Sequence, residues 1–208
     1  MPLLQYSLFF LVEEYAMEYD QVVSARRSIR KYRQESVPEE LIRQILDYAR
    51  LAPSAGNGQH LRYIVVQNSA AAEKLFAQTA WAGHVKPRRT PVWGEDAPRC
   101  FIAVTADSSF NSQLAAADAG AAIENMLLGM ANCGLGGCWI GSFNREKCVE
   151  LLKLDSSETL YYLVSVGYPA EAPVAEDVSA GSDLRYYLDD DDVLHVPKLD
   201  VPSLTRWM

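Results

Sequence analysis

The sequence predicts an α+β fold in which a small mixed sheet is enclosed by helices. Three runs rich in β-branched residues have the length of buried strands: 62–67, 100–106 and 160–169. The segment 114–134 has the length of a helix and is apolar nearly all round, which indicates a fully buried helix. Helices and strands alternate irregularly, so we expect one α+β domain over 18–208 rather than a doubly wound parallel sheet.

The first part of this domain is predicted to form two helices. Residues 20–27 favour a short helix. The stretch 36–53 predicts a longer one, because its apolar residues recur at helical spacing and Pro53 ends the pattern. Ser36 and Glu39 have the spacing of a capping box, so we expect the longer helix to begin there.

The remaining elements follow the first strand. Residues 70–81 predict a helix, and the prolines and glycines of 83–98 predict a long mobile loop, which in a compact domain is usually functional. A further helix is expected at 144–154. In the tail, 185–198, two short alternating runs flank the acidic stretch Asp189–Asp192, a pattern typical of a hairpin.

Residues 1–17 are expected to form an extension, helical and packed on this chain or on a second copy. No Lys or Arg precedes the apolar run Leu8–Val12, and two glutamates follow it. This pattern fits neither a secretory signal nor a membrane span. No other segment approaches the roughly 20 apolar residues of a spanning helix, so we expect no membrane partner and a cytoplasmic location.

The overall charge and the cysteines exclude further classes. The net charge is −8, and a nucleic-acid binding protein carries a basic face, so no nucleic-acid partner is expected. The four cysteines form no C-x-x-C pair and have apolar neighbours, which favours free buried thiols, although a Cys133–Cys138 disulfide stays open. The stretch Asp189–Asp192 lacks the alternating ligands and distal glutamate of a calcium loop, so we expect a solvated turn and no metal.

Two short polar segments could bind a ligand. The stretch 25–32, ARRSIRKY, concentrates positive charge in an acidic chain, and guanidinium groups bind phosphate or carboxylate through paired hydrogen bonds. A solvated basic turn is the alternative. The stretch 53–59, PSAGNGQ, combines donor side chains with glycines that let a ligand approach the backbone. It lacks the lysine of a P-loop and follows a helix, so taken alone it favours an ordinary loop.

A glycine-rich segment at 132–143, NCGLGGCWIGSF, does not match a dinucleotide-binding turn. Trp139 stands where the last glycine of that fingerprint would be, and the segment follows a helix rather than a strand. It predicts a helix that ends at Gly134, followed by a strand that opens at the small residues Gly141 and Ser142.

The histidines suggest no catalytic triad or dyad. His60, His84 and His195 lie in unrelated contexts, and a histidine such as His195 at the end of an apolar run is more often structural. A chain without such an arrangement is either a cofactor enzyme or a binding module.

Taken in order, these segments resemble the nitroreductase family of flavin enzymes. The stretches that carry the resemblance are RRSIRKY, LAPSAGNGQ, AADAGAAIENMLL, GLGGCWIGSF and VGYPAE, and they follow one another as in that family, over roughly 18–200. The resemblance implies a nitroreductase-like fold, an intertwined homodimer and two FMN molecules at its interface.

The resemblance also implies a first group of FMN contacts, within one subunit. The residues that would meet the phosphate, the ribityl chain and the ring edge are Arg26, Ser28 and Arg30, with Arg27 beside them. The residues that would line the isoalloxazine ring are Ile140, Gly141 and Ser142. A backbone N–H at or near Gly141 would point at the flavin N5.

A second group of contacts is implied to come from elsewhere. The residues that the other subunit would contribute are Pro53, Ser54, Ala55 and Asn57. Lys198 resembles the basic residue near the C-terminus that reaches the phosphate, but Leu199 follows it where a second basic residue is common. Relatives often continue the loop after the glutamine with proline and tryptophan, whereas this chain has His60 and Leu61, which changes the packing under the loop.

The implied activity is the reduction of nitroaromatic compounds, quinones or related acceptors by ping-pong hydride transfer, with NADH or NADPH as reductant. Since the flavin carries out the hydride transfer, no catalytic side chain is expected. Two alternatives stay open. One is a specialised enzyme of the same fold, such as a dehalogenase or a flavin-fragmenting enzyme, and the other is a non-catalytic flavin-binding module.

Overall fold

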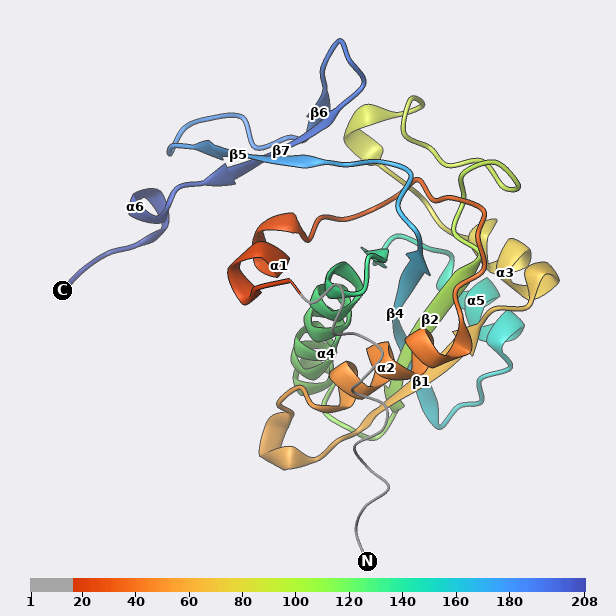
Figure 1. Cartoon of the computed structure of the whole chain (residues 1–208). Helices are drawn as coiled ribbons and strands as arrows, with labels where there is room; N and C mark the ends of the chain where they lie inside the picture. The colour runs from red at the N-terminus through yellow and green to blue at the C-terminus, as the bar shows by residue number, and fades with distance from the viewer. Residues whose placement is uncertain (1–16) are drawn as a thin grey trace, which may run out of the picture.

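A four-stranded antiparallel sheet forms the centre of the molecule in the computed structural model, which describes residues 17–208 (Figure 1). The predicted extension 1–17 therefore lies outside the described residues except for Met17. The strands run in the order β1-β2-β4-β3, and their bounds are Leu61–Val66 for β1, Cys100–Asp107 for β2, Gly136–Ile140 for β3 and Glu158–Gly167 for β4.

Helices cover both faces of this sheet, except for α6, which lies away from it (Figure 1). The bounds of the helices are Tyr19–Ala25 for α1, Glu39–Arg50 for α2, Ser69–Phe76 for α3, Ser112–Asn132 for α4, Arg145–Leu152 for α5 and Val201–Leu204 for α6. Successive residues of a strand point to opposite faces. Accordingly, Ile102 and Val104 of β2 pack in the core with α2 and α4, whereas Phe101 and Ala103 pack in a second core with α3 and α5.

The long helix α4 is buried, as the sequence predicts. Asn111 caps its start by accepting hydrogen bonds from the two backbone N–H groups of Gln113 and Leu114. The helix ends at Asn132, and Gly134 follows shortly after with a φ of 68°, which is accessible to glycine at little cost. The N–H of the next residue, Leu135, donates to the carbonyl of Met130 at 2.8 Å, which completes the predicted glycine C-cap.

A second, three-stranded sheet extends away from the body of the molecule as an arm (Figure 1). Its strands are β5 (Val174–Val178), β6 (Tyr187–Leu188) and β7 (Leu194–Leu199). The antiparallel pair β6–β7 is the predicted hairpin. The parallel strand β5 was not predicted, because VAEDV is short, mostly exposed and has no alternation of apolar and polar residues.

Three sequence-based expectations need correction. The sheet enclosed by helices was expected to be mixed, but its four described strands pair antiparallel, and its parallel contact is the isolated bridge between Ser28 and Gly137. Parallel and antiparallel pairing occur together in the sheet of the arm. The capping box at Ser36 is wrong: α2 begins after Pro38, because the residue before a proline is held extended. The helix predicted over 70–81 ends at Phe76.

Other expectations agree with the described residues. The helices expected at 20–27 and 144–154 appear as α1 and α5, and the loop 83–98 is irregular apart from one short turn at Gly83–Val85. All four cysteines are free. No helix within residues 17–208 is both long enough and apolar enough to cross a membrane.

Candidate functional site

The basic segment 26–33 runs as irregular chain along the edge of the central sheet. Ile29 donates its backbone N–H to the carbonyl of Gly137 in β3 at 2.9 Å. The backbone N–H of Tyr32 donates to the backbone carbonyl of Asp96 at 2.8 Å, and that of Arg33 donates to the backbone carbonyl of Tyr168 at 2.9 Å. Since the segment has no helix or strand of its own, contacts to three other parts of the chain determine its path.

The arginines of this segment lie in different surroundings. Arg26 forms an ion pair with Glu124 of α4 at 3.2 Å. Burial, together with the nearby charge of Arg26, lowers the pKa of Arg27, and the buried Nε of Arg27 has no hydrogen-bond partner in the described chain. The guanidinium of Arg30 lies 5.1 Å from the ring centre of Tyr186. Positive charge is thus crowded here and only partly compensated, which favours an anionic ligand.

A cleft of about 280 Å³ lies next to Arg30. The end of β3 contributes Ile140, Gly141 and Ser142 to its lining, as the resemblance implies. A Cβ placed on Gly141 would meet no atom within 4 Å, so the chain leaves open space at this point. The structure therefore brings Arg30 together with the residues proposed to line a planar ring.

The sequence alone did not identify the other walls of this cleft. They are formed mainly by three aromatic residues and a lysine, namely Trp81, Trp139, Tyr186 and Lys86. Trp81 and Lys86 belong to the segment around the loop 83–98, which was expected to be functional without any residue being assigned. Tyr186 comes from the arm, and no local pattern indicates that it packs beside Arg30.

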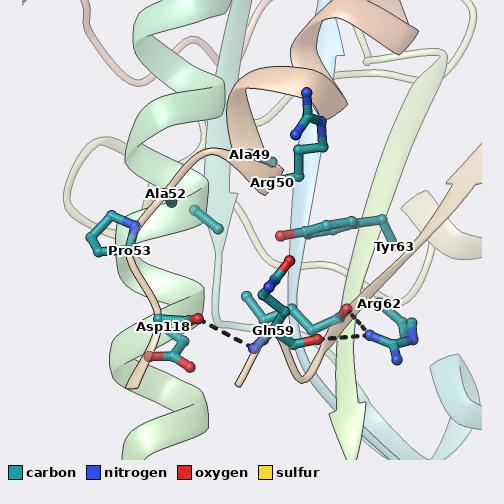
Figure 2. Close-up of a pocket in the computed structure, with 11 residues that line it drawn as sticks. Ala49, Arg50, Ala52, Pro53, Gln59, Arg62, Tyr63 and Asp118 are labelled. Atoms are coloured by element: carbon teal, nitrogen blue, oxygen red, sulfur yellow. Dashed lines mark hydrogen bonds between the residues drawn. The ribbon is translucent and has the colours of Figure 1, made fainter. Parts of the chain in front are cut away.

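The loop 53–59 lies at a separate pocket of about 220 Å³ (Figure 2). Pro53 and Ser54 line this pocket together with the end of α2, β1 and Asp118 of α4. Asp118 is 6% exposed, and its Oδ1 accepts a hydrogen bond from the backbone N–H of Ala55 at 2.9 Å. This bond ties the loop to the long helix, while Asn57 stays exposed.

The backbone of this loop is strained. Gly56, Asn57 and Gln59 all have φ between 50° and 58°. Glycine adopts such values readily, but for the other two residues they are uncommon. Strain of this kind persists only where the surroundings enforce it, and it clusters at functional sites.

Within one chain the proposed FMN contacts fall into separate places. Arg30 and the end of β3 share the cleft, whereas Pro53 and Ser54 line the other pocket. Lys198 lines neither of them: it is exposed on β7, opposite Asp177 of β5. The described chain thus places these predicted contacts in two separate pockets and on the arm rather than in one place.

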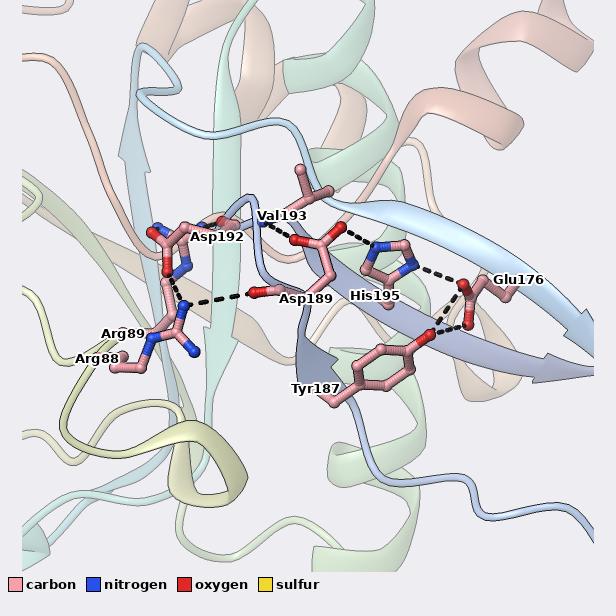
Figure 3. Close-up of polar contacts among 8 residues, drawn as sticks. All are labelled: Arg88, Arg89, Glu176, Tyr187, Asp189, Asp192, Val193 and His195. Carbon is pink, nitrogen blue, oxygen red and sulfur yellow. Dashed lines mark hydrogen bonds and ion pairs between the residues drawn. The ribbon is translucent and has the colours of Figure 1, made fainter.

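The cleft is also lined by a buried thiol, that of Cys138. Burial raises the pKa of the Cys138 thiol, so this group stays neutral and is a poor nucleophile. His195 lies on the arm between Glu176 and Asp189, in agreement with its expected structural role (Figure 3). The cleft suits a planar anionic ligand that brings its own reactivity.

Comparison with known proteins gives consistent results. The sequence profile described as "Nitroreductase family" matches residues 23–168. A protein of Methanothermobacter thermautotrophicus, which bears the provisional name of an NADH dehydrogenase/NAD(P)H nitroreductase, is 34% identical over 168 residues, or 78% of this chain and 83% of its own. The FMN reductase [NAD(P)H] of Bacillus subtilis is 29% identical over 70% of this chain and 63% of its own.

Solved structures agree on the fold. An FMN-dependent nitroreductase from Clostridium difficile matches with a TM-score of 0.63 and 27% identity, over 74% of this chain and 90% of its own. A protein from Desulfovibrio desulfuricans, described provisionally as a nitroreductase and solved in complex with FMN, matches with a TM-score of 0.62 and 30% identity, over 75% of this chain and 88% of its own.

Proposed function

This chain belongs to the nitroreductase family, and on that premise we propose that it is an FMN-dependent enzyme that uses NADH or NADPH to reduce nitroaromatic compounds, quinones or related acceptors. The observation that carries the proposal is the cleft in which Arg30 meets the open end of β3. The names of the relatives support a flavin oxidoreductase of this general kind.

The residues present fit FMN. Its phosphate is doubly charged, and Arg26, Arg27 and Ser28 offer charge and hydrogen-bond donors, including the Arg27 Nε that has no partner in the described chain. The flat ring needs a slot without projecting side chains, and the open space at Gly141 provides one. Ile140 and Ser142 would complete the wall under the ring.

The second half of the site is proposed to come from a partner copy. The residues that the partner would contribute are Pro53, Ser54, Ala55 and Asn57, held in place by the strained loop and by Asp118. Lys198 lines neither pocket within one chain, so we propose that it contacts the phosphate only in the dimer.

When bound, FMN supplies the hydride chemistry. The chain's own part is to orient the ring, to donate a hydrogen bond from the backbone near Gly141 and to leave one face accessible. Trp81 and Tyr186 line the cleft with aromatic rings, which would suit an aromatic acceptor. Because one cleft serves both the reductant and the acceptor, they occupy it in turn, and the kinetics are expected to be ping-pong.

The test is the visible spectrum of the purified protein. We expect a flavin spectrum that NADH or NADPH bleaches without oxygen and that an acceptor restores. Arg26→Ala and Ser54→Ala should each lose FMN on dilution without unfolding, whereas Arg43→Ala, on the exposed face of α2, should retain it as the wild type does. A colourless protein that FMN does not reconstitute contradicts the proposal, and a flavin that neither nucleotide reduces indicates a binding module.

A further inference from the structure

A buried carboxylate stands directly behind the basic segment. Glu171 follows β4, and its side chain is only 3% exposed. Its Oε1 accepts hydrogen bonds from two successive backbone N–H groups, those of Arg30 at 2.5 Å and Lys31 at 3.1 Å. No other acceptor in the described chain bonds to these two groups. The bonds are charge-assisted, which makes them stronger than bonds to a neutral acceptor.

The second carboxylate oxygen of Glu171 faces the loop 83–98. This oxygen accepts no hydrogen bond from the described chain, but it forms an ion pair with Arg89, whose Nε lies 3.5 Å away and whose side chain is 8% exposed. On its other side, Arg89 pairs with the carboxylate of Asp192 at 3.2 Å and donates to the backbone carbonyl of the same residue. One buried guanidinium of the loop 83–98 thus joins two carboxylates that both lie far from it in the sequence.

This arrangement gives the acidic turn of the arm a role beyond solvation. The expectation that Asp189–Asp192 is only a solvated turn is therefore incomplete. Arg88 reaches the turn as well, since its guanidinium lies 2.8 Å from the Asp192 carboxylate (Figure 3). These ion pairs connect the loop 83–98 to the arm. The loop and the arm both line the candidate cleft.

We infer that Glu171 is a positioning residue for the FMN-binding segment and that Arg89 couples this segment to the acidic turn of the arm. The inference rests on the proposed function, because Arg30, whose backbone Glu171 holds, lines the candidate cleft. Glu171 and the arm lie beyond residues 23–168, the region that the family profile covers. The network therefore joins Arg30, Lys31 and Arg89, which lie inside that region, to Glu171 and Asp192, which lie beyond it.

Without the Glu171 carboxylate, the basic segment would lose part of what holds it in place. The N–H groups of Arg30 and Lys31 would keep only a weaker acceptor or none, and Arg89 would remain buried with one anionic partner fewer. The segment would then sample other paths, and the Arg30 guanidinium would leave its place over Tyr186 part of the time.

The test compares Glu171→Gln with wild type in two measurements. In the FMN-free protein, hydrogen–deuterium exchange at the amides of Arg30 and Lys31 should become roughly tenfold faster. In the reconstituted protein, the dissociation constant of FMN should rise by about tenfold or more. The visible circular dichroism of the flavin at saturating FMN should also change, because the ring edge loses a fixed neighbour, whereas a mere loss of stability would leave that signal unchanged.

Two further variants complete the design. Glu39→Gln, which removes a carboxylate from an exposed ion pair on α2, is the matched control and should equal wild type in both measurements. Asp192→Asn should produce the same changes as Glu171→Gln but smaller ones, since it weakens only the far end of the network.

Each outcome decides a separate point. Wild-type exchange at Arg30 and Lys31 in Glu171→Gln overturns the positioning role, whether or not FMN binds. Wild-type behaviour of Asp192→Asn overturns the coupling to the arm. If exchange accelerates but the wild-type protein binds no FMN, the proposed function fails while the role of Glu171 in holding the segment is supported.

Discussion

At the scale of single residues, Gly167 packs closely against Tyr32 of the basic segment. A Cβ on this glycine would lie 2.7 Å from Cδ1 of Tyr32. The Tyr32 side chain is 1% exposed, and its hydroxyl is bonded to the carbonyl of Ile29 and, at 2.7 Å, to the hydroxyl of Ser165. A rigid ring bonded at its far end cannot yield, so only the absence of a side chain at 167 allows this packing.

Gly167→Ala is therefore expected to lower the free energy of unfolding by about 1–3 kcal/mol, the usual cost of overpacking a core. The displaced Tyr32 would also shift the rest of the basic segment 26–33, to which it belongs, so FMN retention should fall. Thermal and urea unfolding measure the first effect. Gly83→Ala is the control, because its Cβ would meet nothing within 4 Å. Equal stability of both variants would contradict the packing argument.

At the scale of elements, a histidine joins the strands of the arm (Figure 3). His195 of β7 bonds through Nδ1 to Glu176 of β5 at 2.6 Å and through Nε2 to Asp189 beside β6 at 2.9 Å. Tyr187 of β6 stacks on the imidazole, with the ring centres 4.9 Å apart. The three short strands, which have little core of their own, depend on this contact.

The bonds to Asp189 and Glu176 raise the pKa of His195 above its ordinary value. Its contribution to stability is therefore fully present below about pH 6.5, the ordinary histidine pKa, and is lost as the pH rises through the raised value. We expect residues 185–199 to exchange amide hydrogens faster at pH 8.5 than at pH 6, after correction for the intrinsic rate. His195→Gln should remove this difference, and a difference that persists in the variant would exclude His195 as its source.

At the scale of the whole molecule, the arm and the helix at its end expose apolar side chains. Val201 and Leu204 of α6 are 69% and 68% exposed, and Leu184 is 51% exposed. Exposed apolar surface on a projecting element marks an interaction site. Together with the separation of the proposed FMN contacts into two pockets, it supports the proposed homodimer, in which the arm would pack against a partner copy.

The double variant Val201→Asp with Leu204→Asp should weaken dimerisation and, with it, FMN retention. Size-exclusion chromatography with light scattering measures the first effect, and flavin absorbance after dilution measures the second. Leu151→Asp, on the exposed side of α5, is the control. A wild-type monomer that retains FMN would be incompatible with a site shared between subunits.

Much of this protein could be predicted from local sequence. Helical spacing and β-branched runs identified the central strands and most helices, because burial of one face imposes a period that the residues reveal. The glycine C-cap at Gly134 followed from chain geometry. The order of the short motifs indicated the family and the segment around Arg30, although no single motif was specific.

Only the tertiary structure decided which of these segments meet. The strand β5 is formed by pairing with β7 rather than by any pattern of its own. Glu171 stands in the quoted stretch VGYPAE, but its bonds to the backbone of Arg30 join residues 141 positions apart. Local sequence determines what each segment favours, whereas a contact between distant segments depends on how the whole chain packs. The sequence thus indicated the candidate site, and the tertiary structure showed what holds it in place.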